Sequence, residues 1–122
     1  MTAKSTPADV AIPARDIHFD VAAAREGHWL GGDPVGTAVF NALSLTFPDG
    51  ERMFVEAVRH YRNSVSGKLA EDVRGFVAQE AIHAREHHTL NQLIDRNRYP
   101  VAEIEASVRE RIAFARSRGP MR

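Results

Sequence analysis

Apolar residues recur every three or four positions between Leu69 and Ile94, which is the spacing of one face of an α-helix. This stripe consists of Leu69, Val73, Phe76, Val77, Leu90 and Ile94. The strand signal is much weaker, because only residues 17–21 alternate briefly and nothing nearby offers a partner or a hairpin turn. The sequence therefore predicts an all-α protein, a helical bundle whose longest helix spans about residues 69–96.

Proline and capping residues divide the rest of the chain into shorter predicted helices. Asp33 and Pro34 are typical of a helix start, and Pro48 is expected to end that helix because proline lacks the N–H of a helix interior. Asp49 is then a cap for the next helix, which turns near Ser66 into an antiparallel hairpin. The four expected helices span about residues 34–46, 50–64, 69–96 and 101–116.

Length and charge limit the kinds of protein that this chain can be. Its 122 residues suffice for one hydrophobic core, so we expect a loose arm over residues 1–16 and one helical domain over residues 17–122. Sixteen basic and sixteen acidic residues, without a Lys/Arg block, argue against a nucleic-acid partner. No apolar segment is long enough to span a membrane or forms a secretory signal, so we expect a cytoplasmic protein.

The side chains available for chemistry are histidines and carboxylates, since the chain has six histidines and no cysteine. Several of them interrupt buried helix faces. Glu80, His83 and His87 continue the stripe of the longest helix, and Glu51 lies on the apolar stripe of the helix before it. A buried, unpaired carboxylate costs several kcal/mol, so the fold must supply a compensating cation, donor network or subunit contact.

The expected hairpin places these ionisable groups at one level. Glu51 and Glu80 both lie roughly 21–22 Å from the turn at 1.5 Å per residue, and His83 is one helical turn from Glu80. Bundles that hold two metal ions use inward glutamates and Glu-x-x-His pairs in this way. The pattern indicates a metal site between the helices, with Glu51, Glu80 and His83 as ligands and His87 as a further nitrogen donor or an outer-shell group.

Two other interpretations of these residues stay open. The same stripe could form the contact of a non-catalytic helical dimer, with its Glu and His side chains paired to Arg59, Arg74 or Arg85. The run His83-Ala-Arg-Glu86-His87 also spells the inverted zincin pattern, in which two histidines bind zinc and a glutamate acts as the base. In that case the third protein ligand would come from Glu103, Glu105 or Glu110.

Two longer runs resemble the bacterial family labelled predicted metal-dependent hydrolase. They are Leu43-Ser-Leu-Thr-Phe-Pro-Asp-Gly-Glu-Arg-Met-Phe54 and Val73-Arg-Gly-Phe-Val-Ala-Gln-Glu-Ala-Ile-His-Ala-Arg-Glu-His87, the second followed by Leu90-Asn91. The segment Gly31-Gly-Asp-Pro34 also matches. The resemblance covers about residues 15–115. It implies a ferritin-like helical protein with a carboxylate- and histidine-bound metal centre, whose motif residues correspond here to Glu51, Glu80, His83 and His87.

The resemblance also shapes what we expect of cofactor and assembly. Members of that family run to roughly twice this length, and their later helices carry further Glu–His elements. We therefore expect this chain either to be an N-terminal piece or to complete its site as a homodimer. The expected cofactor is a divalent metal, with Fe or Mn favoured over Zn, and the expected reaction is Lewis-acid hydrolysis or oxygen-dependent chemistry on a small molecule.

Overall fold

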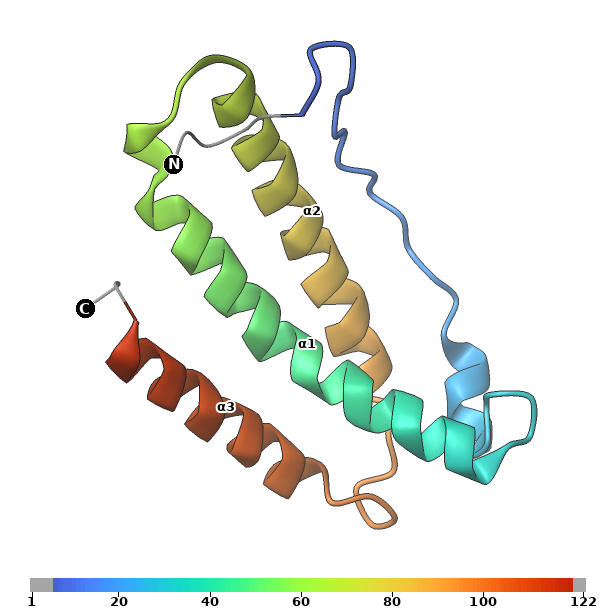
Figure 1. Ribbon diagram of the computed structural model, residues 1–122. Coiled ribbons are helices and arrows are strands. Elements are labelled where there is room, and N and C mark those ends of the chain that lie inside the picture. Colours follow the sequence, from blue (N-terminus) through green and yellow to red (C-terminus); the bar gives the residue numbers. More distant parts are fainter. Residues whose placement is uncertain (1–5, 120–122) are drawn as a thin grey trace.

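Three α-helices form the fold of residues 6–119, which are the residues that this computed structural model describes. α1 spans Pro34–His60, α2 spans Gly67–Asn91 and α3 spans Val101–Arg118, with short 3-10 helices at Ala22–Glu26 and Arg62–Ser64. α1 packs against both other helices, and α2 runs antiparallel to it (Figure 1). The all-α prediction is confirmed. Within the described residues, no helix is long and apolar enough to cross a bilayer.

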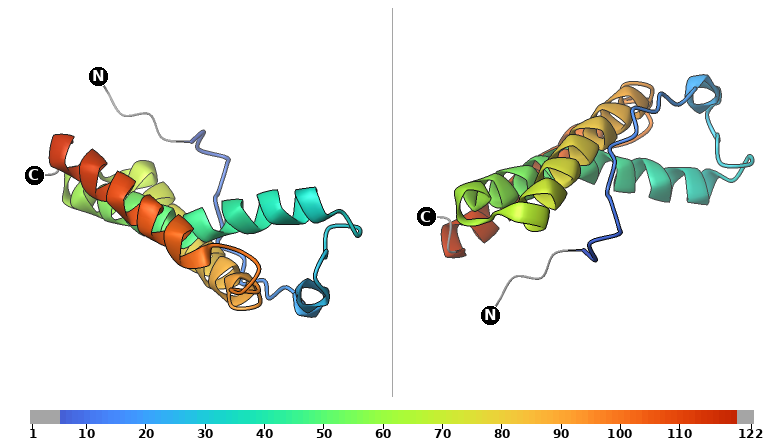
Figure 2. Two further views of the ribbon diagram at one scale, coloured as in Figure 1. Left: turned by 90° about the horizontal axis from the view of Figure 1, so that it is seen from below. Right: turned by 90° about the horizontal axis from the view of Figure 1, so that it is seen from above.

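The first two predicted helices are one continuous helix, so the predicted break at Pro48 is wrong. Pro48 lies inside α1. Asp49 also lies within the helix, where it pairs with Arg52 at 3.1 Å instead of capping a helix start. A proline in a helix interior removes one backbone hydrogen bond and bends the helix. α1 does change direction along its length, as Figure 2 shows.

The other helix boundaries follow local side-chain chemistry. Asp33 accepts a hydrogen bond from the backbone N–H of Val35 at 2.9 Å, as expected of the residue that caps α1. α2 ends at Asn91, earlier than the predicted end near residue 96. The side chain of Asp95 accepts from the backbone N–H of Asn97 at 2.9 Å, and such a local bond favours a turn over another helical turn. The predicted last helix is confirmed as α3.

Over residues 6–119, buried polar side chains outnumber buried apolar ones. The buried apolar side chains are Leu45, Ile94 and Val101. The buried polar ones are Thr37, Asn41, Ser44, Glu51, Asp72 and Asn91. Four of these six lie on α1 at three-, four- or seven-residue spacing, which places them on one face of the helix. α1 therefore turns a polar face inward, and each group on that face needs a partner.

The segment before α1 lies beside α2 over residues 6–19 (Figure 1). Thr6 donates to the Asp72 carboxylate from its backbone N–H at 2.9 Å and from its hydroxyl at 2.8 Å. The backbone carbonyl of Ile12 approaches Gly75 so closely that a Cβ there would lie 2.4 Å from the oxygen. Residues 6–16 belong to the predicted loose arm, whose first five residues lie outside the described residues.

Candidate metal centre

Glu51 is the buried centre of the site, with only 2% of its surface exposed. Neither carboxylate oxygen forms a hydrogen bond of normal geometry within the described part of the chain. Burial raises the pKa of Glu51, the nearby His83 opposes that rise, and the carboxylate of Glu80 adds to it. A buried carboxylate with open acceptor positions destabilises the fold unless a cation or a proton compensates it.

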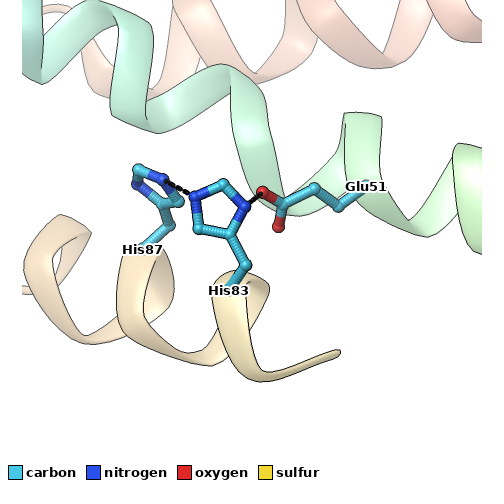
Figure 3. A group of neighbouring side chains, drawn as sticks. All are labelled: Glu51, His83 and His87. Carbon is cyan, nitrogen blue, oxygen red and sulfur yellow. Dashed lines mark hydrogen bonds and ion pairs between the residues drawn. The ribbon is translucent and has the colours of Figure 1, made fainter. Parts of the chain in front are cut away.

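His83 reaches Glu51 from α2. Its Nδ1 lies 2.7 Å from Oε1 of Glu51, within ion-pair distance but not aligned as a hydrogen bond (Figure 3). The same nitrogen lies 3.9 Å from Oε2 of Glu80. The side chain of His83 is 48% exposed, so this imidazole lies between the buried carboxylate of Glu51 and the solvent.

His87 lies one helical turn further along α2 and completes the group. Its Nε2 is 3.0 Å from Nε2 of His83, so the two imidazoles and Glu51 form a row (Figure 3). Phe47 stacks on the His87 ring at a centroid distance of 4.4 Å. Burial, and secondarily the neighbouring His83, lowers the pKa of His87. The neutral imidazole, which is the form that binds metals, is thereby favoured.

The proton on His87 is placed by two buried residues behind it. Asn91 donates from Nδ2 to the Ser44 carbonyl at 3.2 Å, so its Oδ1 faces the Ser44 hydroxyl 2.7 Å away. That hydroxyl has one proton, which it donates to Asn91. It must therefore accept from Nδ1–H of His87, 2.8 Å away. This leaves the lone pair of His87 Nε2 directed toward His83, as an outer shell does for a metal-binding histidine.

Pro48 explains why the Ser44 carbonyl can accept a hydrogen bond from Asn91. In a regular α-helix that carbonyl would accept the N–H of the residue four positions later, which here is Pro48. Proline has no N–H, and Asn91 donates in its place. Sequence reasoning missed Ser44 and Asn91. The available signals were a proline four residues after Ser44 and an asparagine four residues after His87.

Together, Glu51, His83 and His87 form a group that could hold a metal ion. Each offers one ligand atom, and these atoms lie within 4.8 Å of one another. A carboxylate with two imidazoles suits Zn, Fe or Mn. The unfilled acceptor positions of Glu51 and the Nε2 lone pair of His87, which faces Nε2 of His83, fit such an ion. The structure thus brings together three of the four predicted ligands, whereas Glu80 lies beside them and its ligand role stays a prediction.

Glu86, the base of the inverted zincin pattern, faces the segment before α1. Its carboxylate accepts from the backbone N–H of Phe19 at 3.0 Å and from Nε of Arg85 at 2.8 Å. These two bonds hold the pKa of Glu86 below its usual value. Among the described residues, no glutamate of α3 joins the group of ligand atoms. The third zincin ligand expected from Glu103, Glu105 or Glu110 is therefore not supplied in this arrangement.

Arg85, one of the arginines considered for a dimer contact, is engaged within the chain. It pairs with Asp16 at 2.7 Å and donates to the carbonyl of Ile17 at 3.1 Å. Its bond to Glu86 completes a polar link between α2 and the segment before α1.

Comparison with protein families places this chain beside proteins that are described by a predicted activity. The model of one protein family, described as predicted metal-dependent hydrolase, matches residues 13–122. Neither the search of curated proteins nor the search of solved structures gave a match.

Proposed function

The chain belongs to the predicted metal-dependent hydrolase family, and from this premise we propose that Glu51, His83 and His87 bind a divalent metal ion for hydrolysis of a small molecule. The observation that carries the proposal is the buried carboxylate of Glu51, which faces two imidazoles without a hydrogen bond of normal geometry from the described residues. A divalent cation at this position supplies a Lewis acid that activates water and polarises the substrate.

The three side chains have different roles in this proposal. Glu51 brings the negative charge. Its carboxylate is buried, so little water screens the attraction between this charge and a cation. His87 offers a lone pair that Ser44 holds in place. His83 is the half-exposed member, so water and substrate approach the centre on its side. Glu80 is a further carboxylate ligand in this proposal, because it adjoins His83.

Metal identity separates hydrolysis from the oxygen-dependent alternative. Oxygen activation needs a redox metal, whereas hydrolysis also works with Zn. A carboxylate-rich ligand set that includes Glu80 favours Fe or Mn. Elemental analysis of protein from its own host, together with tests of activity with and without oxygen, distinguishes these cases.

The experiment is a calorimetric titration of metal-free protein with Zn²⁺, Mn²⁺ and, without oxygen, Fe²⁺. We expect saturable binding of at least one ion, and Glu51→Gln and His87→Ala should each weaken it by at least tenfold. Glu110→Gln, on the exposed surface of α3, is the matched control and should leave binding unchanged. Folded protein that binds none of the three ions, or variants that bind like the control, would reject the proposal.

Glu80 and the homodimer need their own measurements. Glu80→Gln should weaken binding if this carboxylate is a ligand, and an unchanged affinity would remove it from the set. A second copy that completes the ligand set would make the metal-loaded protein a dimer by light scattering. A metal-loaded monomer would instead indicate a site made by one chain.

A further inference from the structure

A cavity of about 370 Å³ adjoins the two imidazoles, outside the group of ligand atoms. It lies between α2 and the segment that precedes α1. His83 and His87 border it, and most of its other lining residues are apolar: Phe19, Val21, Ala23, Ala24, Trp29 and Leu90. Small-molecule sites are typically apolar hollows of about 300–1,000 Å³ with a few polar groups. This cavity is at the small end of that range.

Polar contacts behind the cavity hold its walls in place. Phe19 is held by its backbone N–H, which donates to Glu86. The indole Nε1–H of Trp29 donates to the buried Oδ1 of Asn41 at 2.9 Å. The segment before α1 is thus tied to α2 at Phe19 and to α1 at Trp29. The cavity is therefore expected to exist before a ligand enters, which reduces the entropy cost of binding.

Four polar side chains border the cavity: Asp20, His83, Glu86 and His87. The carboxylate of Asp20 accepts from the backbone N–H of Ala22 at 3.0 Å. The carboxylate of Glu86 is occupied by Arg85 and by the Phe19 N–H, so its charge is already partnered. The imidazoles of His83 and His87 lie at the side nearest Glu51. Phe19 and Trp29 offer aromatic surface, which favours contact with another ring.

We propose that this cavity binds a compact, uncharged molecule with an aromatic ring and one hydroxyl or carbonyl group, with the oxygen directed toward His83 and His87. This inference deepens the proposed function. The reaction of the bound molecule depends on the metal centre, whereas its binding in the apolar cavity does not.

Trp29 allows a direct test because it is the only tryptophan of the chain. Bromine quenches indole fluorescence on contact, so 4-bromobenzyl alcohol reports occupancy of the cavity. In metal-free protein we expect saturable quenching, and unbrominated benzyl alcohol should reverse it by competition. Ala24→Leu fills the cavity and should weaken binding by at least tenfold. Ala102→Leu, on the exposed surface of α3, is the matched control and should bind like the unchanged chain.

Measurements on the unchanged chain are sufficient to overturn the inference. They do so if quenching rises linearly without saturation, or if benzyl alcohol does not reverse it. Equal affinities in Ala24→Leu and Ala102→Leu would also overturn it. The outcome of the metal titration does not depend on the outcome of the quenching experiment. If no ion binds but the quenching saturates and competes, the proposed function is wrong and the apolar site stands.

Discussion

Asn91 donates a hydrogen bond from its side chain to the main-chain carbonyl of Ser44, 3.2 Å away on the facing helix. The bond joins the backbone of α1 to α2 at the level of the candidate metal centre. It also fixes the amide of Asn91, so that the Ser44 hydroxyl donates to Oδ1 and accepts from His87. A backbone feature of α1 thereby determines which nitrogen of His87 is available to a metal.

Ser44→Ala should weaken metal binding by about 10- to 100-fold, because His87 loses the acceptor for its Nδ1–H. Chelator competition measures the affinity, and ¹⁵N chemical shifts of the His87 ring report its tautomer directly. Ser107→Ala, on the exposed surface of α3, is the control. An Nδ1–H tautomer and an affinity that both persist in Ser44→Ala would show that Ser44 does not position His87.

Pro48→Ala should separate stability from metal binding. Alanine restores an N–H that competes with Asn91 for the Ser44 carbonyl, so the metal affinity should fall. Alanine also favours the helix interior over proline by up to about 3 kcal/mol, so thermal unfolding of the metal-free protein should shift upward. Pro34→Ala, in the first turn of α1 where proline is tolerated, should change little. A lower unfolding temperature in Pro48→Ala would contradict this account.

The helices could be predicted from the sequence wherever local rules decide them. Apolar spacing gave α2 and α3, and the Asp33 cap gave the start of α1. The rule that failed was the helix stop at Pro48. It treats the carbonyl freed by proline as a cost, whereas here Asn91 from a distant part of the chain satisfies that carbonyl. A contact across more than forty positions leaves no mark on the local pattern.

The residues of the candidate site could be predicted where an ionisable side chain interrupts the apolar face of a helix. Glu51, His83 and His87 interrupt apolar faces, and the structure brings them together. For Ser44 and Asn91 the sequence offered only the spacing to Pro48 and to His87, which is a weak signal because single polar residues on a helix are ordinary. Glu80 was expected level with Glu51, and its carboxylate is near enough to raise the pKa of Glu51. The side chain that reaches Glu51 is His83, one turn later, which the sequence also predicted to converge there.

Glu86→Ala should release the segment before α1 without affecting the metal centre. The Phe19 N–H loses its acceptor, so its amide should exchange with solvent faster, while the metal affinity stays unchanged. Glu86→Gln retains an acceptor and should retain most of the protection. Loss of hydrolysis in Glu86→Gln while the metal stays bound would instead support the inverted zincin interpretation.

Asp72 should make stability depend on pH in the acidic range. Its bond from Lys68, and then its bonds from Thr6, lower its pKa from the ordinary value of 3.8. A carboxyl with a lower pKa in the folded state stabilises the fold above 3.8, and that contribution is lost as the pH falls through the lowered pKa. Asp72→Asn should therefore lower the unfolding temperature at pH 7, and the difference should shrink in acid. Glu71→Gln, at the neighbouring exposed position, is the control and should show no such pH dependence. If the difference in unfolding temperature between Asp72→Asn and the unchanged chain stays constant with pH, the role given to Asp72 is wrong.

Glu51→Met should stabilise the metal-free protein and abolish its stabilisation by metal. Methionine has a similar volume and no charge, so the substitution removes the desolvation cost of a buried carboxylate that has no hydrogen-bond partner among the described residues. His83 keeps access to water, so it tolerates the loss of its partner. The unchanged chain should gain about 2.7 kcal/mol when the ion is present at 100 times its Kd, and Glu51→Met should gain none. Denaturant unfolding with and without metal measures both effects, with Glu110→Gln as control. If Glu51→Met instead destabilises the metal-free protein strongly, then the carboxylate of Glu51 is a structural partner of His83 and not a vacant ligand.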